Sequence, residues 1–114
     1  MFLYQLKLDV PEKNLDEFID SLRHLSSEIQ EEQGCLDFSL YRHHAKKEAY
    51  RVLGKWKTRQ AMEAHFKRDN FAVLIGAAKV LGEDFEMSID KTLEKGGYPL
   101  AEDKSFAHPV SNYQ

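Results

Sequence analysis

The sequence has few of the residues that mark a disulfide-bonded, metal-binding or nucleic-acid-binding protein. It contains a single cysteine, Cys35, which excludes an intrachain disulfide and any site built from several thiolates. Basic residues are not in excess, because 16 Lys and Arg against 19 Asp and Glu give a formal net charge of -3. A chain with this charge has no general attraction to a phosphate backbone or an anionic lipid surface. We therefore expect no nucleic acid and no membrane among its partners.

A long hydrophobic run is also missing. The first nine residues alternate between apolar and polar side chains, unlike a signal peptide or a transmembrane segment. This pattern leads us to expect a cytoplasmic protein. The chain has 114 residues, of which 42% are hydrophobic and 31% charged, and this composition fits one globular domain with one core.

Alternating patterns predict four strands, at residues 2–9, 35–43, 48–57 and 83–93. Only a short polar segment separates the second strand from the third, which favours a hairpin. Each strand places apolar side chains on one face, namely Phe2, Tyr4, Leu6 and Leu8, then Leu36, Phe38 and Leu40, then Tyr50, Val52 and Trp56, then Phe85, Met87 and Ile89.

Helical periodicity predicts a long helix after the first strand and two shorter helices before the fourth. Asn14 is expected to cap the long helix, with Glu17 completing a capping box, and the helix ends near Gly34. Thr58 and Asp69 are expected to cap the two later helices. The order of elements is that of a ferredoxin-like βαββαβ domain of the α+β class. We expect residues 1–94 to form this domain and residues 95–114 to form a C-terminal tail.

The predicted sheet has two unlike faces. The helices should cover the apolar face, because their apolar stripes need a surface to pack on. The opposite face mixes the apolar side chains of Leu3, Tyr41 and Leu53 with charged ones. Such a face suits either water or a second copy of the chain.

Several segments together resemble the antibiotic biosynthesis monooxygenase family. They are Glu32-Gln33-Gly34-Cys35-Leu36, Trp56 at the end of the third strand, and Glu63-Ala64-His65-Phe66 followed by Phe71. The resemblance covers about residues 2–93. The segment from Trp56 into the following helices, with Glu86-Met87-Ser88-Ile89 in the fourth strand, looks particularly like bacterial quinol monooxygenases. It implies a homodimer that forms a dimeric α/β barrel, with a pocket between each sheet and its own helices. It also implies oxidation of a small aromatic molecule, such as a quinol, by molecular oxygen without a cofactor or metal.

Some positions depart from the patterns of this family. Asn70 stands where quinol monooxygenase-like sequences often carry a histidine. Haem-degrading relatives carry Asn, Trp and His at positions that correspond here to Gln5 or Lys7, to His65 and to Ile75. Haem binding is therefore not expected.

His65 is the expected catalytic residue. A phenol-like substrate must lose or share its hydroxyl proton before the anion reacts with oxygen, and imidazole titrates near neutral pH. The alternative for His65 is a partly buried side chain bonded to a backbone carbonyl. The expected substrate contacts are Tyr50, Trp56, Asn70, Phe66, Phe71, Tyr4, Phe38 and Met87.

Each of the other candidates has a structural alternative. Core packing is the favoured role for Trp56, and starting a helix is the favoured role for Asn70. Cys35 is expected to face away from the helix-covered pocket, which disfavours covalent catalysis. His43 and His44 are expected on opposite faces of a strand, where they cannot chelate one metal ion. Two charged runs are expected to be solvated, Glu28, Glu31 and Glu32, and Lys67 and Arg68.

Two other functions remain open. A helix segment, Asp16-Glu17-Phe18-Ile19, is similar to one in a sugar-phosphate isomerase of autoinducer breakdown, although the predicted pocket has few basic groups for a phosphate. The absence of an unmistakable catalytic constellation also allows a non-catalytic dimeric module that binds a ligand or serves in stress. The tail, with Tyr98, Phe106 and Tyr113, is expected to lie across the partner subunit.

Overall fold

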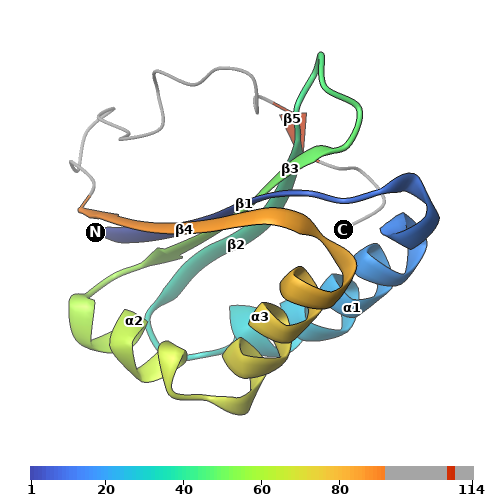
Figure 1. The fold of residues 1–114 in the computed structure, drawn as a ribbon. Helices are drawn as coiled ribbons and strands as arrows, with labels where there is room; N and C mark the ends of the chain where they lie inside the picture. The colour runs from blue at the N-terminus through green and yellow to red at the C-terminus, as the bar shows by residue number, and fades with distance from the viewer. Residues whose placement is uncertain (92–107, 110–114) are drawn as a thin grey trace.

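The computed structural model describes residues 1–91 and 108–109 (Figure 1). Its elements in chain order are β1 (Phe2–Asp9), α1 (Glu12–Gln30), β2 (Cys35–Arg42), β3 (Ala49–Trp56), α2 (Arg59–Phe66), α3 (Asp69–Leu81), β4 (Glu83–Lys91) and β5 (His108–Pro109). The predicted ferredoxin-like α+β fold is confirmed.

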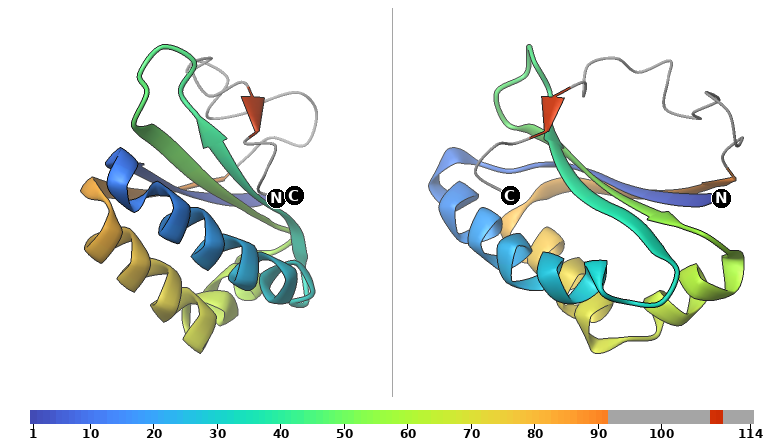
Figure 2. Two further views of the ribbon diagram at one scale, coloured as in Figure 1. Left: turned by 90° about the vertical axis from the view of Figure 1, so that its right-hand side faces the viewer. Right: turned by 180° about the vertical axis from the view of Figure 1, so that it is seen from behind.

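The strands form one antiparallel sheet in the order β4-β1-β3-β2-β5. All three helices lie on the same face of this sheet, as the two views of Figure 2 show. Along the described chain, no helix is long and apolar enough to cross a membrane. β5 pairs with the end of β2, Pro109 opposite Tyr41 and His108 opposite Arg42. The tail residues Tyr98, Phe106 and Tyr113 lie outside the described residues.

The core fills the space between the sheet and the helices. α1 contributes one apolar stripe, and β1, β2 and β3 contribute the side chains on the face that was predicted from the alternation. These side chains are shielded from water, which is the main source of folding free energy for a domain of this size. The core residues that are 0–1% exposed include Tyr4, Leu6, Phe38, Leu40, Val52, Trp56, Phe18 and Leu22.

A register shift in β2 contradicts the predicted positions of Cys35 and Leu36. Cys35 pairs with Trp56, whereas Asp37 pairs with Lys55, so one extra residue bulges out between them. The bulge turns Cys35 to the helix-covered side, where it packs against the core, and leaves Leu36 53% exposed. Burial raises the pKa of the Cys35 thiol to about 11, so the thiolate nucleophile is disfavoured.

The predicted helix caps are right at Thr58 and wrong at Asn14 and Asp69. The Thr58 hydroxyl accepts the Ala61 amide at 3.1 Å, as expected of an N-cap. α1 begins earlier than predicted, directly after Pro11, and the Asn14 side chain instead donates to the Leu81 carbonyl at the end of α3. Asp69 is the first residue of α3 and makes no cap bond.

The hairpin between β2 and β3 holds the two adjacent histidines in an unexpected arrangement. β2 ends at Arg42, so strand alternation does not reach His43 and His44, and their rings stack with centroids 5.1 Å apart. The His43 Nδ1 accepts the backbone amides of Ala45 and Lys46, each at 3.0 Å. His43 therefore shapes the turn, and the prediction that the two rings point to opposite faces is wrong.

β4 occupies an edge of the sheet, next to β1 only. Met87 pairs with Leu6 and Ile89 with Tyr4, so both lie on the helix-covered face as the alternation predicted. Met87 is nevertheless 36% exposed and Ile89 52% exposed, because β4 is an edge strand of the described sheet.

Candidate active site

His65 lies at the centre of the most unusual cluster in the core. Its side chain, from the last turn of α2, is 0% exposed. Its Nε2 is 2.7 Å from the Tyr4 hydroxyl oxygen, and its Nδ1 is 2.9 Å from Glu32 Oε1. The three side chains come from β1, from the turn after α1 and from α2. The expected catalytic residue therefore has a hydrogen-bond partner at each ring nitrogen, and neither partner is a backbone carbonyl.

Local backbone geometry brings Glu32 to His65. α1 ends at Gln30, and the chain turns through Gly34, whose φ of +83° is a conformation that glycine adopts readily. A Cβ atom at Gly34 would lie 2.5 Å from the Cβ atom of Ala61 in α2. Only a residue without a side chain lets the turn come so close to α2, and this approach places Glu32 beside the imidazole.

Glu32 is a candidate site residue that the sequence analysis did not select. Its side chain is 5% exposed, which contradicts the expectation that the whole acidic run is solvated. Its second oxygen, Oε2, lies 3.6 Å from Arg68 Nε, an ion pair too long to count as a hydrogen bond. Arg68 itself is 60% exposed, as expected. The run was misjudged because Glu28 and Glu31 are exposed on or at the end of α1, whereas Glu32 follows the helix and turns inward.

Aromatic rings enclose the imidazole of His65. Trp56 stacks on it with ring centroids 4.5 Å apart and an angle of 28° between the planes. Phe71 meets it edge-on at 5.2 Å, and Phe66 lies 6.0 Å away. Tyr4 completes this enclosure, since its ring also contacts both phenylalanines. We refer to Tyr4, Trp56, Phe66 and Phe71 as the aromatic cage.

The hydrogen-bond partners determine where the His65 proton resides. A carboxylate only accepts hydrogen bonds, so Nδ1 carries the hydrogen and donates it to Glu32. The lone pair of Nε2 then accepts the hydroxyl hydrogen of Tyr4. Burial lowers the pKa of His65 below its ordinary value, although the neighbouring Glu32 acts in the opposite direction. His65 is therefore neutral near pH 7 and suited to accept a proton at Nε2.

The other four predicted contacts lie at different places in the fold. Tyr50 is at the opposite end of β3 from Trp56, roughly 20 Å along the strand at the usual rise per residue. Burial raises its pKa above the ordinary value. Phe38 is buried on the sheet opposite Gly54, and Met87 lies at the β4 edge. Asn70 is in the first turn of α3, where it helps to line a surface hollow.

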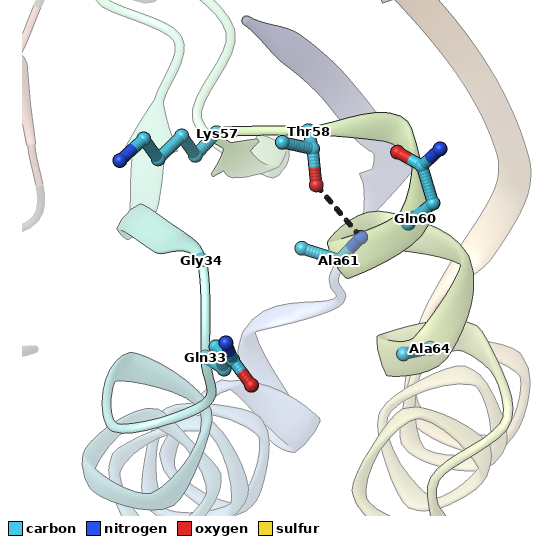
Figure 3. Close-up of a pocket in the computed structure, with 7 residues that line it drawn as sticks. All are labelled: Gln33, Gly34, Lys57, Thr58, Gln60, Ala61 and Ala64. Carbon is cyan, nitrogen blue, oxygen red and sulfur yellow. Dashed lines mark hydrogen bonds between the residues drawn. The ribbon is translucent and has the colours of Figure 1, made fainter.

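Three hollows are lined by described residues. One of about 440 Å³ lies between the turn at Gly34 and the start of α2, bordered by Gln33, Gly34, Lys57, Thr58, Gln60, Ala61 and Ala64 (Figure 3). A second of about 480 Å³ lies between α1 and β2, and a third of about 370 Å³ at the turn from α2 to α3. None of the three is lined by His65, Trp56 or Tyr4. The imidazole of His65 therefore borders none of these three hollows.

Within the described residues, no group of three or more His, Cys, Asp and Glu side chains is arranged to hold a metal ion. The contacts of His65 allow proton transfer at Nε2, supported by the Glu32 carboxylate at Nδ1.

Comparison with known proteins agrees with this fold. Among solved structures, a protein of Deinococcus radiodurans named for the antibiotic biosynthesis monooxygenases has a TM-score of 0.76 at 18% identity, over 86% of this chain and 98% of that one. A mutant of SnoaB, a cofactor-independent oxygenase from Streptomyces nogalater, has a TM-score of 0.72 at 15% identity, over 83% and 95% of the two chains. A conserved protein from Methanosarcina mazei has a TM-score of 0.72 at 23% identity, over 79% and 90%.

At these identities the structural matches show the fold alone. No curated protein matches the chain. The family model of the antibiotic biosynthesis monooxygenases matches residues 1–76, which contain β1, the turn with Glu32, α2 with His65, and the whole aromatic cage. The chain therefore belongs to the antibiotic biosynthesis monooxygenase family.

Proposed function

We propose that the protein is a monooxygenase that oxidises a small aromatic or quinol-like compound with molecular oxygen and without a cofactor. The observation that carries this proposal is the buried hydrogen-bonded series from Glu32 through His65 to the hydroxyl of Tyr4. Membership of the family supports oxygenase chemistry, and SnoaB, which shares the fold, is a cofactor-independent oxygenase.

The first chemical step is transfer of the substrate's acidic proton to His65 Nε2. Neutral imidazole accepts this proton, and the imidazolium that forms is stabilised by the Glu32 carboxylate 2.9 Å from Nδ1. Because the surroundings are aromatic and closed to water, the attraction between imidazolium and carboxylate is only weakly screened. The product of this step is a phenolate or enolate.

Oxygen then reacts with the electron-rich anion. One oxygen atom is incorporated into the organic product and the other leaves as water, with the substrate itself supplying the two electrons and two hydrogens that this water requires. In an anthrone, the CH₂ group beside the activated ring becomes a carbonyl, and in a quinol a ring C–H becomes C–OH while the quinol loses two hydrogens to become a quinone. The aromatic cage keeps bulk water from the anion while it reacts.

An oxygen electrode tests the proposal with a panel of reduced quinones and anthrones. We expect saturable oxygen uptake with at least one compound, and loss of that uptake in His65→Gln. Glutamine keeps much of the side-chain volume but cannot accept a proton near neutral pH. If no compound in the panel raises uptake above that of the variant, the oxygenase assignment is wrong.

We also propose that the protein works as a cytoplasmic homodimer, with two sheets facing each other as in the dimeric α/β barrels of the family. The face turned away from the helices carries Leu3 and Leu53 beside Gln5 and Arg51, and a Gln5 side-chain oxygen there has no hydrogen-bond partner among described groups. Light scattering at micromolar concentration should give twice the chain mass. A monomeric mass would contradict this part of the proposal.

One observation favours a second candidate, a ligand-binding or structural module without turnover. His65, Trp56 and Tyr4 are all 0% exposed, so a substrate can reach Nε2 only after the core rearranges. The oxygen-electrode panel separates the two functions, because a module without turnover binds compounds and consumes no oxygen with any of them.

A further inference from the structure

Only one nitrogen of His65 is available for chemistry. Nδ1 is held by Glu32 at 2.9 Å, so any proton that the imidazole accepts must arrive at Nε2. In the structure Nε2 already holds a phenol, the side chain of Tyr4, at 2.7 Å. The hydroxyl of a phenolic substrate needs the same position, because a proton is transferred to an imidazole only over a hydrogen-bond distance.

The ring of Tyr4 lies in a closely fitted slot. Gly54 forms its floor, since a Cβ atom at that position would lie 2.5 Å from Tyr4 Cε2 and 2.9 Å from Tyr4 Cζ. His65 stacks on the Tyr4 ring at 5.4 Å between centroids. Phe66 and Phe71 meet the same ring edge-on at 5.3 and 5.7 Å. All of these contacts are made to the ring of Tyr4, so a flat aromatic ring of another molecule could make the same contacts.

The slot contains a second polar group. The indole Nε1 of Trp56 is buried and has no hydrogen-bond partner among the described residues. It approaches the same point above Gly54 to 3.1 Å. A buried N–H without an acceptor is rare in folded proteins and leaves the slot with an unused donor for an oxygen-bearing ligand.

We propose that the space filled by the Tyr4 ring is the ring subsite for the substrate, and that Tyr4 leaves it when a phenol binds. The side chain of Tyr4 is then a built-in occupant whose hydroxyl stands where the substrate hydroxyl binds. This inference rests on the proposed role of His65 as proton acceptor. It names the substrate class more closely, as a molecule that presents a single phenolic ring with a free hydroxyl at one end.

The test removes the Tyr4 side chain from the slot and adds a small aromatic molecule from solution to bind in its place. Tyr4→Ala deletes a phenol ring, so the probes are phenol and benzene, which differ only in the hydroxyl. We expect phenol to bind this variant about tenfold more tightly than benzene, because the hydroxyl regains its hydrogen bond to Nε2. Phenol should also move the ¹⁵N resonance of His65 Nε2, whereas benzene should not.

Phe18→Ala provides the matched control. Phe18 is 0% exposed in the same core and is not part of the aromatic cage, so its removal leaves a ring-sized cavity without an imidazole partner. Benzene should bind there at least as well as phenol. If phenol has no advantage over benzene in Tyr4→Ala, or has the same advantage in both variants, the subsite assignment is overturned. Tyr4→Val, with a side chain suited to a strand, serves the same test if the alanine variant does not fold.

The wild-type protein tests whether phenol can displace the Tyr4 side chain from the slot. Phenol should bind it saturably but at least about tenfold more weakly than it binds Tyr4→Ala, because the ring of Tyr4 must first be displaced. No saturable binding up to the solubility limit would contradict the displacement. None of these measurements involves oxygen, so a protein that binds phenol in this slot and consumes no oxygen would refute the proposed monooxygenase and leave the subsite standing.

Discussion

At the scale of single residues, the pairing of Glu32 with His65 carries most of the chemical argument. The carboxylate orients the imidazole through Nδ1 and opposes the effect of burial on the pKa of His65. Glu32 touches no substrate in this account, so it is a positioning residue. Its role is measurable without any substrate.

Glu32→Gln should lower the pKa of His65 further. The substitution keeps a hydrogen-bond acceptor at Nδ1 but removes the negative charge that favours imidazolium. An NMR titration of the His65 ring resonances measures this pKa directly. Glu31→Gln is the matched control, because Glu31 is the exposed neighbour at the end of α1. Equal pKa values for His65 in both variants would rule out the charge interaction.

Acid should destabilise the protein through His65. Because the pKa of His65 is lower in the folded state than the ordinary value near 6.5, the unfolded chain binds the proton more tightly. The stabilisation is fully present above about pH 6.5 and is lost as the pH falls towards the folded-state pKa, at up to about 1.4 kcal/mol per pH unit. The charged or titratable groups that face the ring are Glu32, Arg68 and Tyr4.

Urea unfolding between pH 5 and 7.5 measures this loss. The wild-type protein and His44→Gln, which lacks an exposed histidine of the hairpin, should lose the same free energy of unfolding on acidification. His65→Gln should lose less, since it has no buried imidazole to protonate. The same pH dependence in all three proteins would exclude His65 as its source.

The sequence pointed to His65, which lies at the centre of the buried cluster, but not to the groups that surround it. His65 was selected by the chemistry of imidazole and by a family pattern, and both criteria are local in sequence. Its partners are 33 and 61 residues away, so they become neighbours only when α2 packs on β1 and on the turn after α1. Tyr4 was expected as a substrate contact, and the structure places it in direct hydrogen-bond contact with the imidazole. Gly34, which permits the approach of Glu32, was interpreted only as a helix stop.

At the scale of secondary-structure elements, the turn between α1 and β2 has the strictest geometry. Gly34→Ala should destabilise the protein by about 1–3 kcal/mol, because alanine is strained at a positive φ and its Cβ would collide with that of Ala61. Gly76→Ala is the control. Gly76 lies within α3 with nothing near its added Cβ, so alanine there should raise stability by up to about 1 kcal/mol through helix propensity.

Urea denaturation of the two glycine variants measures both effects. Opposite signs are expected, with the Gly34 variant the less stable of the two. If Gly34→Ala unfolds at the same urea concentration as the wild type, the turn does not require glycine and its role in placing Glu32 is wrong.

Element boundaries show which local signals are reliable. Hydrophobic alternation placed β1 at its observed bounds, because Phe2, Tyr4, Leu6 and Leu8 follow one another on a single face over the length of the strand. It failed at the start of β2, where the bulge between Cys35 and Asp37 inserts a residue and reverses the faces. A polar residue near the expected start of a helix was also an ambiguous signal, because the Asn14 side chain donates to the Leu81 carbonyl and does not cap α1.

At the scale of the whole molecule, the ferredoxin-like architecture follows from the order of the elements. A sheet with one apolar face needs the helices on that face, and both α1 and the pair α2 and α3 cover it (Figure 2). The hydrophobic pattern of the sequence alone does not indicate how much of this sheet face the helices cover. Met87 and Ile89 lie on the right face and are nevertheless exposed, because β4 is the last strand at its edge.

The pH dependence of oxygen uptake tests the central claim, that His65 accepts the substrate proton at Nε2. With a reduced quinone or anthrone from the panel, wild-type uptake should fall as the pH drops through the His65 pKa that NMR gives for the same protein. The fall reflects protonation of the acceptor nitrogen, and Glu32→Gln should move it to lower pH. Uptake that is unchanged in His65→Gln, or a pH profile that does not follow the pKa of His65, would contradict the account.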